Sequence, residues 1–297
     1  MSLANNPWEE PGATRPVSGL FGSVDAEHLS LGTAIEAAFK SLAKPAFILP
    51  IVVIAVVINA VLELTLLPVI SRSVRVSPGG QPTIEDMGAL MGAAGVTFIV
   101  SLIGSILAAV YGQVWAVAAS VGPFPTVGET LALVRRRWLG VLGAGLLVGL
   151  LTIGVLAGGV VVLAVLGSIN RAIAFGVAVG LAIVFIWFVA RLYMAPWLAA
   201  DGAPVVESVQ RSWLITRGSV LRIIGWTIAY GLLFALLAGA LGVVLGRVPL
   251  IGQGIGQGIS LALGYAAGVT LYRRTQAAAM PPGAASGVPP VTGTPIG

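Results

Sequence analysis

Long apolar runs alternate with short polar segments along most of this chain. Six runs are long enough for a helix to cross a bilayer, and they lie at about 46–70, 88–119, 138–166, 171–198, 219–246 and 249–272. A hydrocarbon core about 30 Å thick takes roughly 20 residues of helix. The pattern therefore predicts six membrane-spanning helices.

A second pattern recurs before every odd-numbered run, as a short amphipathic segment that contains a glutamate. Its three copies are Gly32–Lys40, Val127–Trp138 and Val205–Gly218. Segments of this kind are typical of helices that lie at the membrane interface. We expect an all-α polytopic fold made of three parallel repeats, each an interfacial helix followed by a helical hairpin.

The repeat glutamates are Glu36, Glu129 and Glu207. Glu36 and Glu207 lie four residues before the basic residues Lys40 and Arg211, a spacing that forms ion pairs on a helix. The favoured interpretation is structural, with each glutamate pairing or capping locally to orient its helix. The alternative is a shared vestibule that the three acids line together.

Composition agrees with a membrane protein. The 297 residues are 57% hydrophobic and only 9% charged, with a mean hydropathy of +1.01. Soluble domains carry about 25% charged residues, so lipid must be the solvent for most of this surface. Two polar stretches rich in Pro and Gly, 1–26 and 276–297, are predicted to be disordered tails around a membrane domain at 27–275.

The basic residues give an orientation. Of the 16 Lys and Arg residues, twelve lie on the side of the termini and the amphipathic segments, and only Arg72, Arg75, Arg171 and Arg247 lie on the other. The positive-inside rule then places both termini in the cytoplasm. We interpret the net charge of +5 as a preference for membrane lipids with anionic headgroups and not for nucleic acid. The arginines expected to contact those headgroups are Arg135, Arg136, Arg137, Arg211, Arg217 and Arg222.

Polar residues within the spans are the candidates for a substrate path. Glu63 lies toward the outer end of the first span, with Asn59 one helical turn before it. An acid at that depth is costly unless it is paired, hydrated or protonated. It is either a proton or cation site shared with Asn59, or an interfacial partner of one of the outer arginines. Gln113, Gln253 and Gln257 are further intramembrane polar candidates.

Glycines spaced four residues apart recur in the spans, which is typical of helices that pack closely in membranes. Gln253 and Gln257 lie inside the densest example, with the pairs Gly252/Gly256 and Gly254/Gly258. The same spacing predicts packed faces at Gly88/Gly92, Gly145/Gly149, Gly154/Gly158, Gly176/Gly180, Gly242/Gly246 and Gly264/Gly268.

Signals for catalysis are weak. The chain has no cysteine and one histidine, His28, and no His, Asp and Glu cluster has the spacing of a metal site. No serine lies in a nucleophile-elbow motif. We therefore expect no enzymatic activity, no metal and no cofactor.

One stretch resembles a known family. Ala195-Pro196-Trp197 and then Gly202–Gly218, which contains Glu-Ser, Ser-Trp and Thr-Arg-Gly, are similar to the membrane domain found with some bacterial glycerophosphoryl diester phosphodiesterases. They also resemble related stand-alone six-span proteins of unknown function from actinobacteria. The resemblance extends over roughly 30–275 and is specific over about 195–220, and the first repeat lacks the tryptophan. The soluble catalytic barrel has no counterpart here, so the resemblance implies a six-span protein of the bacterial plasma membrane and not phosphodiesterase activity.

Three functions follow as hypotheses. The first is a non-enzymatic protein that binds, moves or organises lipids or other envelope components, with a lipid-accessible groove between repeats. The second is a secondary transporter that uses Glu63 and Asn59. The third is an accessory or assembly subunit that packs against a membrane-protein partner or a second copy of itself.

Overall fold

The computed structural model describes residues 30–75, 84–245, 247–248 and 251–279, and every regular element in these ranges is an α-helix. The predicted tails, apart from residues 276–279, lie outside the described residues. The helices are α1 (Leu31–Leu42), α2 (Pro45–Arg75), α3 (Ile84–Ala119), α4 (Val127–Ile169), α5 (Arg171–Leu192), α6 (Ala195–Ala200), α7 (Val205–Ile215), α8 (Val220–Leu245) and α9 (Gly252–Ala279).

Six stretches of these helices are long and apolar enough to cross a membrane. They comprise α2, α3, α4, α5 continued by α6, α8 and α9. The predicted all-α polytopic fold is confirmed, and the chain is a multi-pass integral membrane protein. The fourth predicted span, 171–198, is interrupted after Leu192, and α6 begins with Pro196 in its first turn. Helix α9 continues to Ala279, so residues 276–279 are helical, whereas the sequence predicts them to be part of the disordered C-terminal tail.

The second amphipathic segment is not a separate helix, which corrects the sequence interpretation. Residues 127–138 form the first turns of α4, a helix of 43 residues. The first copy ends just before Pro45, and the third ends at Gly218, whose φ of 83° favours glycine. Nothing comparable follows Trp138, so the helix continues directly into the membrane-spanning part.

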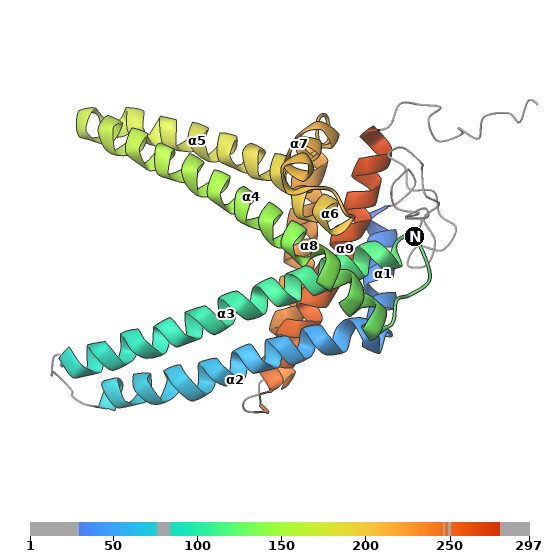
Figure 1. Cartoon of the computed structure of the whole chain (residues 1–297). Helices are drawn as coiled ribbons and strands as arrows, with labels where there is room; N and C mark the ends of the chain where they lie inside the picture. Colours follow the sequence, from blue (N-terminus) through green and yellow to red (C-terminus); the bar gives the residue numbers. More distant parts are fainter. Residues whose placement is uncertain (1–29, 76–83, 246, 249–250, 280–297) are drawn as a thin grey trace, which may run out of the picture.

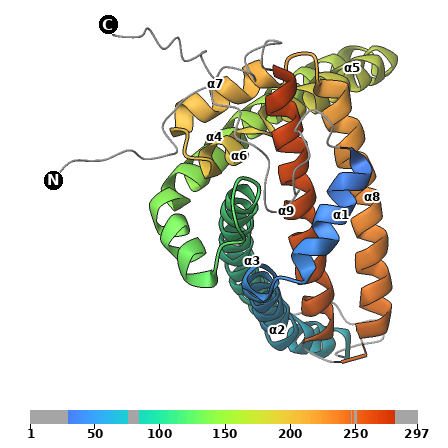
Figure 2. The same ribbon diagram turned by 90° about the vertical axis from the view of Figure 1, so that its right-hand side faces the viewer.

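The two hairpins α2/α3 and α4/α5 are joined near one end of the molecule and diverge toward the other (Figure 1). We call the end that carries α1, α6 and α7 the base, and the ends where α2 meets α3 and α4 meets α5 the tips. At the second tip a single residue, Asn170, separates α4 from α5, and its side chain accepts a hydrogen bond from Ala172 N at 2.8 Å. Figure 2 shows α9 through the middle of the bundle, with α8 beside it.

Glycines let α9 take this central position. A Cβ on Gly254 would lie 2.5 Å from Val56 Cα, and one on Gly258 would lie 2.6 Å from Val52 Cα. Helices α2 and α9 therefore approach backbone to backbone, as the Gly254/Gly258 spacing predicts. Most of the apolar window of α9, 61%, is buried in protein, whereas that of α4 is 0% buried.

Most of the other predicted glycine faces are wrong within the described residues. A Cβ added to these glycines would meet no neighbouring element within 4 Å. They are Gly88, Gly92, Gly145, Gly149, Gly154, Gly158, Gly176, Gly180, Gly242 and Gly264. Gly246 lies outside the described residues. Gly268 is an exception, because its Cβ would lie 2.5 Å from the indole ring of Trp197.

A buried polar network closes the base. Arg273 on α9 forms an ion pair with Asp201, which follows α6, at 2.9 Å. Its Nε donates to Ser120 Oγ at the end of α3, also at 2.9 Å. Tyr272 Oη donates to the same Asp201 carboxylate and accepts from Gln276. The network thus joins the ends of α3, α6 and α9. These helices end the α2/α3 hairpin, the α4/α5 hairpin with its continuation α6, and the α8/α9 pair.

The close approach of α2 and α9 predicts a sharp effect at Gly254. A Gly254→Ala substitution adds a methyl group against the α2 backbone, and such overpacking typically costs about 1–3 kcal/mol. We expect the free energy of unfolding, measured by SDS titration in detergent micelles, to fall by about this amount. Gly154→Ala is the control, because its methyl group has open space. Equal stability of the two variants would contradict the packing described for α9.

The base network predicts a larger effect. Asp201→Ala leaves the charge of Arg273 in a site where the two side chains are only 9% and 16% exposed. Removing one partner of a buried ion pair costs about 3–5 kcal/mol. The same SDS titration should show this loss, whereas Glu207→Ala, which breaks the exposed pair with Arg211, should cost at most about 1 kcal/mol. Similar losses in both variants would show that the base network is not important for stability.

Candidate functional site, a polar groove between the hairpins

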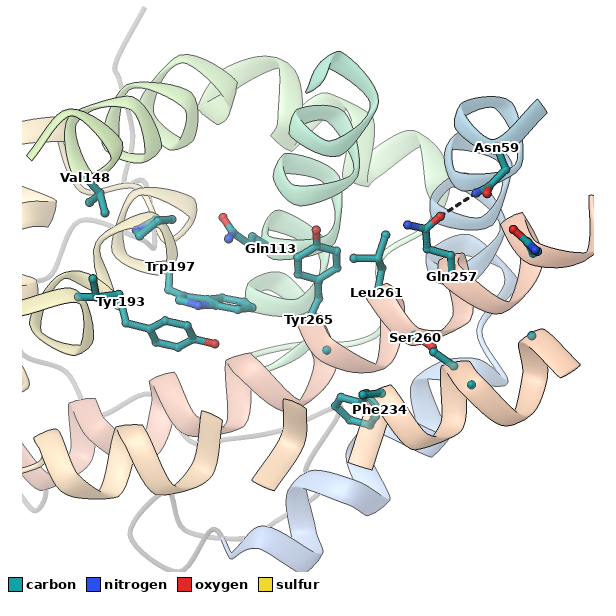
Figure 3. A pocket seen from close by; sticks show the side chains of 18 of the residues that line it. Asn59, Gln113, Val148, Tyr193, Trp197, Phe234, Gln257, Ser260, Leu261 and Tyr265 are labelled. Atoms are coloured by element: carbon teal, nitrogen blue, oxygen red, sulfur yellow. Dashed lines mark hydrogen bonds between the residues drawn. The ribbon is translucent and has the colours of Figure 1, made fainter. Parts of the chain in front are cut away.

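A cavity of about 1040 Å³ lies between the two hairpins and the pair α8/α9, and it is open on one side. Residues from α2, α3, α4, α5, α6, α8 and α9 line it. Apolar side chains such as Phe234 and Leu261 form most of its surface (Figure 3). We call this cavity the groove. Its polar lining residues are Asn59, Gln113, Tyr193, Gln253, Gln257, Ser260 and Tyr265.

The polar residues of α9 form a stripe along the groove. Gln253, Gln257 and Ser260 follow each other at three- and four-residue steps, which places them on one face of the helix. Tyr265 extends the groove lining further along α9. From Gln253 to Tyr265 the helix rises about 18 Å at 1.5 Å per residue. The groove is therefore elongated, and its polar positions are spread along it instead of gathering at one point.

Asn59 and Gln257, two of the polar candidates from the sequence, bind each other at the tip end of the groove. Asn59 Nδ2 donates to Gln257 Oε1 at 2.7 Å and to Ala55 O at 2.9 Å. The sequence interpretation grouped Asn59 with Glu63, but Glu63 does not line the groove. Of this predicted pair, Asn59 is the member that lines the groove.

At the base end, Gln113 faces the groove next to Trp197 of α6 and Tyr265 of α9 (Figure 3). Its Oε1 is buried and has no hydrogen-bond partner among the described residues. The preceding residue, Gly112, would place a Cβ 2.2 Å from the ring of Tyr265, so the ring lies where any side chain would stand. In the same way the ring of Trp197 lies on Gly268. Glycines thus make room for two of the aromatic rings that line the groove, those of Tyr265 and Trp197.

Sequence reasoning missed Tyr193, Trp197, Ser260 and Tyr265. The helical period could have found Ser260, because it lies three residues after Gln257 on the same face. Tyr193 comes from another hairpin than Tyr265, and no local pattern links them. Only the tertiary arrangement of the helices brings both to the groove.

The arginines predicted to bind headgroups lie apart from the groove and differ among themselves. Five of the six are exposed, namely Arg135, Arg136, Arg211, Arg217 and Arg222. Arg211 forms an ion pair with Glu207 at 2.5 Å. Arg137 is half-buried and donates to Ala200 O, which ties α4 to α6. None of the six lines the groove.

A further arginine, Arg191 near the end of α5, holds α7 in place. Its Nη1 donates to Trp213 O at 2.6 Å, and its guanidinium lies 5.0 Å and 4.9 Å from the ring centroids of Trp187 and Trp213. Ser212 Oγ donates to Arg191 O at 2.7 Å. The guanidinium of Arg191 is therefore held at the base by contacts within the protein.

The repeat glutamates have local partners. Glu36 pairs with Lys40 at 2.7 Å, and Glu207 with Arg211, as their spacing predicts. Glu129 accepts from Thr126 N at 2.8 Å and completes a capping box at the start of α4. None of these glutamates is among the groove-lining residues.

The chemistry of the groove is hydrogen bonding and apolar contact. The residues that line it within the described chain include no Asp, Glu, Lys, Arg or His. In the same part of the chain, no group of three His, Cys, Asp or Glu residues lies close enough to hold a metal ion. Comparison with known proteins gives no further assignment, because no family model, no curated protein and no solved structure matches this chain.

Proposed function

We propose that this integral membrane protein binds a membrane lipid, or another amphiphile from the bilayer, in the groove between its hairpins. The observation that carries the proposal is the elongated apolar lining crossed by a stripe of amide and hydroxyl groups. A lipid needs both surfaces, an apolar one for its chains and polar groups for its headgroup. The volume of about 1040 Å³ lies at the upper end of the range for small-molecule sites, about 300–1,000 Å³.

The divergence of the hairpins provides the route by which a lipid reaches the groove. The hairpins α2/α3 and α4/α5 come together at the base and separate toward the tips (Figure 1), and residues of both line the groove. A lipid enters sideways from the bilayer without crossing a wall of protein. The protein then binds, moves or organises lipids without chemistry of its own.

The base supplies a second contact with the membrane. Arg135, Arg136, Arg217 and Arg222 are exposed there and attract anionic headgroups of the surrounding leaflet. The excess of basic residues on this side supports a base that faces the cytoplasm of a bacterium. The likeness of residues 195–220 to the membrane domain found with glycerophosphoryl diester phosphodiesterases supports a distant relationship to that family, without its catalytic activity.

Lipid binding is tested by closing the groove. Ala238 lines it from α8, so Ala238→Trp should fill the space that a ligand occupies. We expect mass spectrometry of protein purified in mild detergent to find about one retained lipid per chain, and at least a severalfold loss in this variant.

The matched control is Leu236→Trp on the same helix, at a side chain that is 74% exposed and does not line the groove. It should keep the bound lipid. Equal retention in both variants, or no lipid in the unmodified protein, would rule out the groove as a lipid site.

The orientation is tested with single cysteines, since the chain has none of its own. Arg247→Cys lies in the connection between α8 and α9, and Arg217→Cys lies at the base between α7 and α8. A membrane-impermeant maleimide added to intact cells should label the first variant only, and the second only after permeabilisation. Labelling in the reverse order would place the base outside the cell.

A further inference from the structure

The groove also carries information about the headgroup it accepts. Its described lining residues are polar at several positions and charged at none. A phosphate or carboxylate held in apolar surroundings needs a nearby cation or several strong donors, because the lost hydration of a charge is not otherwise replaced. An uncharged headgroup has no such requirement.

The arginines closest in sequence to groove residues do not line the groove. Arg191 lies between the lining residues Val189 and Leu192, but its Nη1 donates to Trp213 O and its guanidinium lies against two tryptophan rings, while its Nε is buried without a hydrogen-bond partner among the described residues. Arg247, four residues after the lining residue Val243, is exposed. Neither arginine is among the residues that line the groove.

One end of the groove offers an acceptor that the protein leaves unused. Asn59 and Gln257 bind each other near the tips. At the base end, Gln113 Oε1 is buried and has no partner among the described residues. A buried acceptor of this kind is stabilised when a donor reaches it, and a lipid hydroxyl is such a donor.

The surroundings of Gln113 suit a hydroxylated headgroup. Tyr193 and Tyr265 line the groove at this end, and each phenol can both donate and accept. Beyond them toward the tips, Phe234, Leu261 and Ala238 provide an apolar wall. The arrangement gives an unpaired acceptor and two phenols at the base end and an apolar wall beside them, mainly on α8, while the polar stripe of α9 continues toward the tips.

We propose that the groove selects an uncharged lipid with free hydroxyl groups, such as a diacylglycerol or a glycosylated diacylglycerol. A headgroup hydroxyl donates to Gln113 Oε1, and the acyl chains lie against the apolar wall of α8. This proposal rests on the proposed function, because it names the class of lipid that the same groove binds.

The test is native mass spectrometry of the full chain in detergent, titrated separately with three lipids that have identical oleoyl chains. They are dioleoylglycerol, monoglucosyl dioleoylglycerol and dioleoyl phosphatidylglycerol. We expect at least one of the two uncharged lipids to bind about tenfold more tightly than phosphatidylglycerol. The tighter of these two identifies the source of the hydroxyl, a glycerol backbone or a sugar.

Gln113→Leu removes the acceptor at nearly constant volume and should weaken binding of the favoured uncharged lipid by about tenfold. Gln253→Leu is the matched control at the tip end of the groove and should change binding by less than about twofold. Thermal unfolding in detergent shows whether each variant is folded. If Gln113→Leu does not fold, the comparison of the three lipids on the unmodified chain decides alone.

The outcomes separate the two proposals. Phosphatidylglycerol binding as tightly as both uncharged lipids, or a folded Gln113→Leu variant that binds normally, overturns the headgroup assignment and leaves lipid binding intact. Binding of none of the three lipids overturns the proposed function itself.

Discussion

The buried ion pair between Arg273 and Asp201 is the constraint on which the arrangement of this bundle depends. Water is scarce at this position, so each charge is stable only while the other is present. Ser120 and Tyr272 bind the remaining polar atoms of the pair, which is what makes such a site tolerable in a low dielectric. Through these contacts the ends of α3, α6 and α9 meet at one point. The hairpins are therefore anchored at the base, and their tips are free to diverge.

That divergence produces the groove. The most apolar windows of α4 and of α5 with α6 are 0% buried in protein. Helix α9 is the opposite case, since Gly254 and Gly258 allow contact with α2 at backbone distance while Gln253 and Gln257 line the cavity. One helix therefore uses neighbouring faces for packing and for polar contact.

The basic residues of the base have several roles that composition alone could not separate. Arg273 is neutralised by a carboxylate, and Arg191 is bound by a carbonyl and two tryptophan rings. Arg211 forms an exposed helical ion pair, whose contribution to stability is small. Arg135, Arg136, Arg217 and Arg222 are exposed. The basic residues of the base thus include cations bound within the structure as well as exposed ones.

Local patterns in the sequence predicted the six apolar helices, the i,i+4 pairs of Glu36 and Glu207, and the close packing of Gly254 and Gly258. These features depend on neighbours within a few residues or on the length of one run, so the sequence displays them directly. The merging of the second amphipathic segment into α4 was also readable in principle, since no breaker follows Trp138.

Only the tertiary structure decided which distant residues meet. Asn59 binds Gln257, 198 residues away, in addition to Ala55 O one turn before it on its own helix. Arg273 finds Asp201 from 72 residues away, and the rings of Tyr265 and Trp197 rest on glycines of other helices. Such contacts depend on which helix faces belong to protein and which to lipid. In a membrane both kinds of face are apolar, so their residues look alike in the sequence, and the choice emerges only when the helices pack.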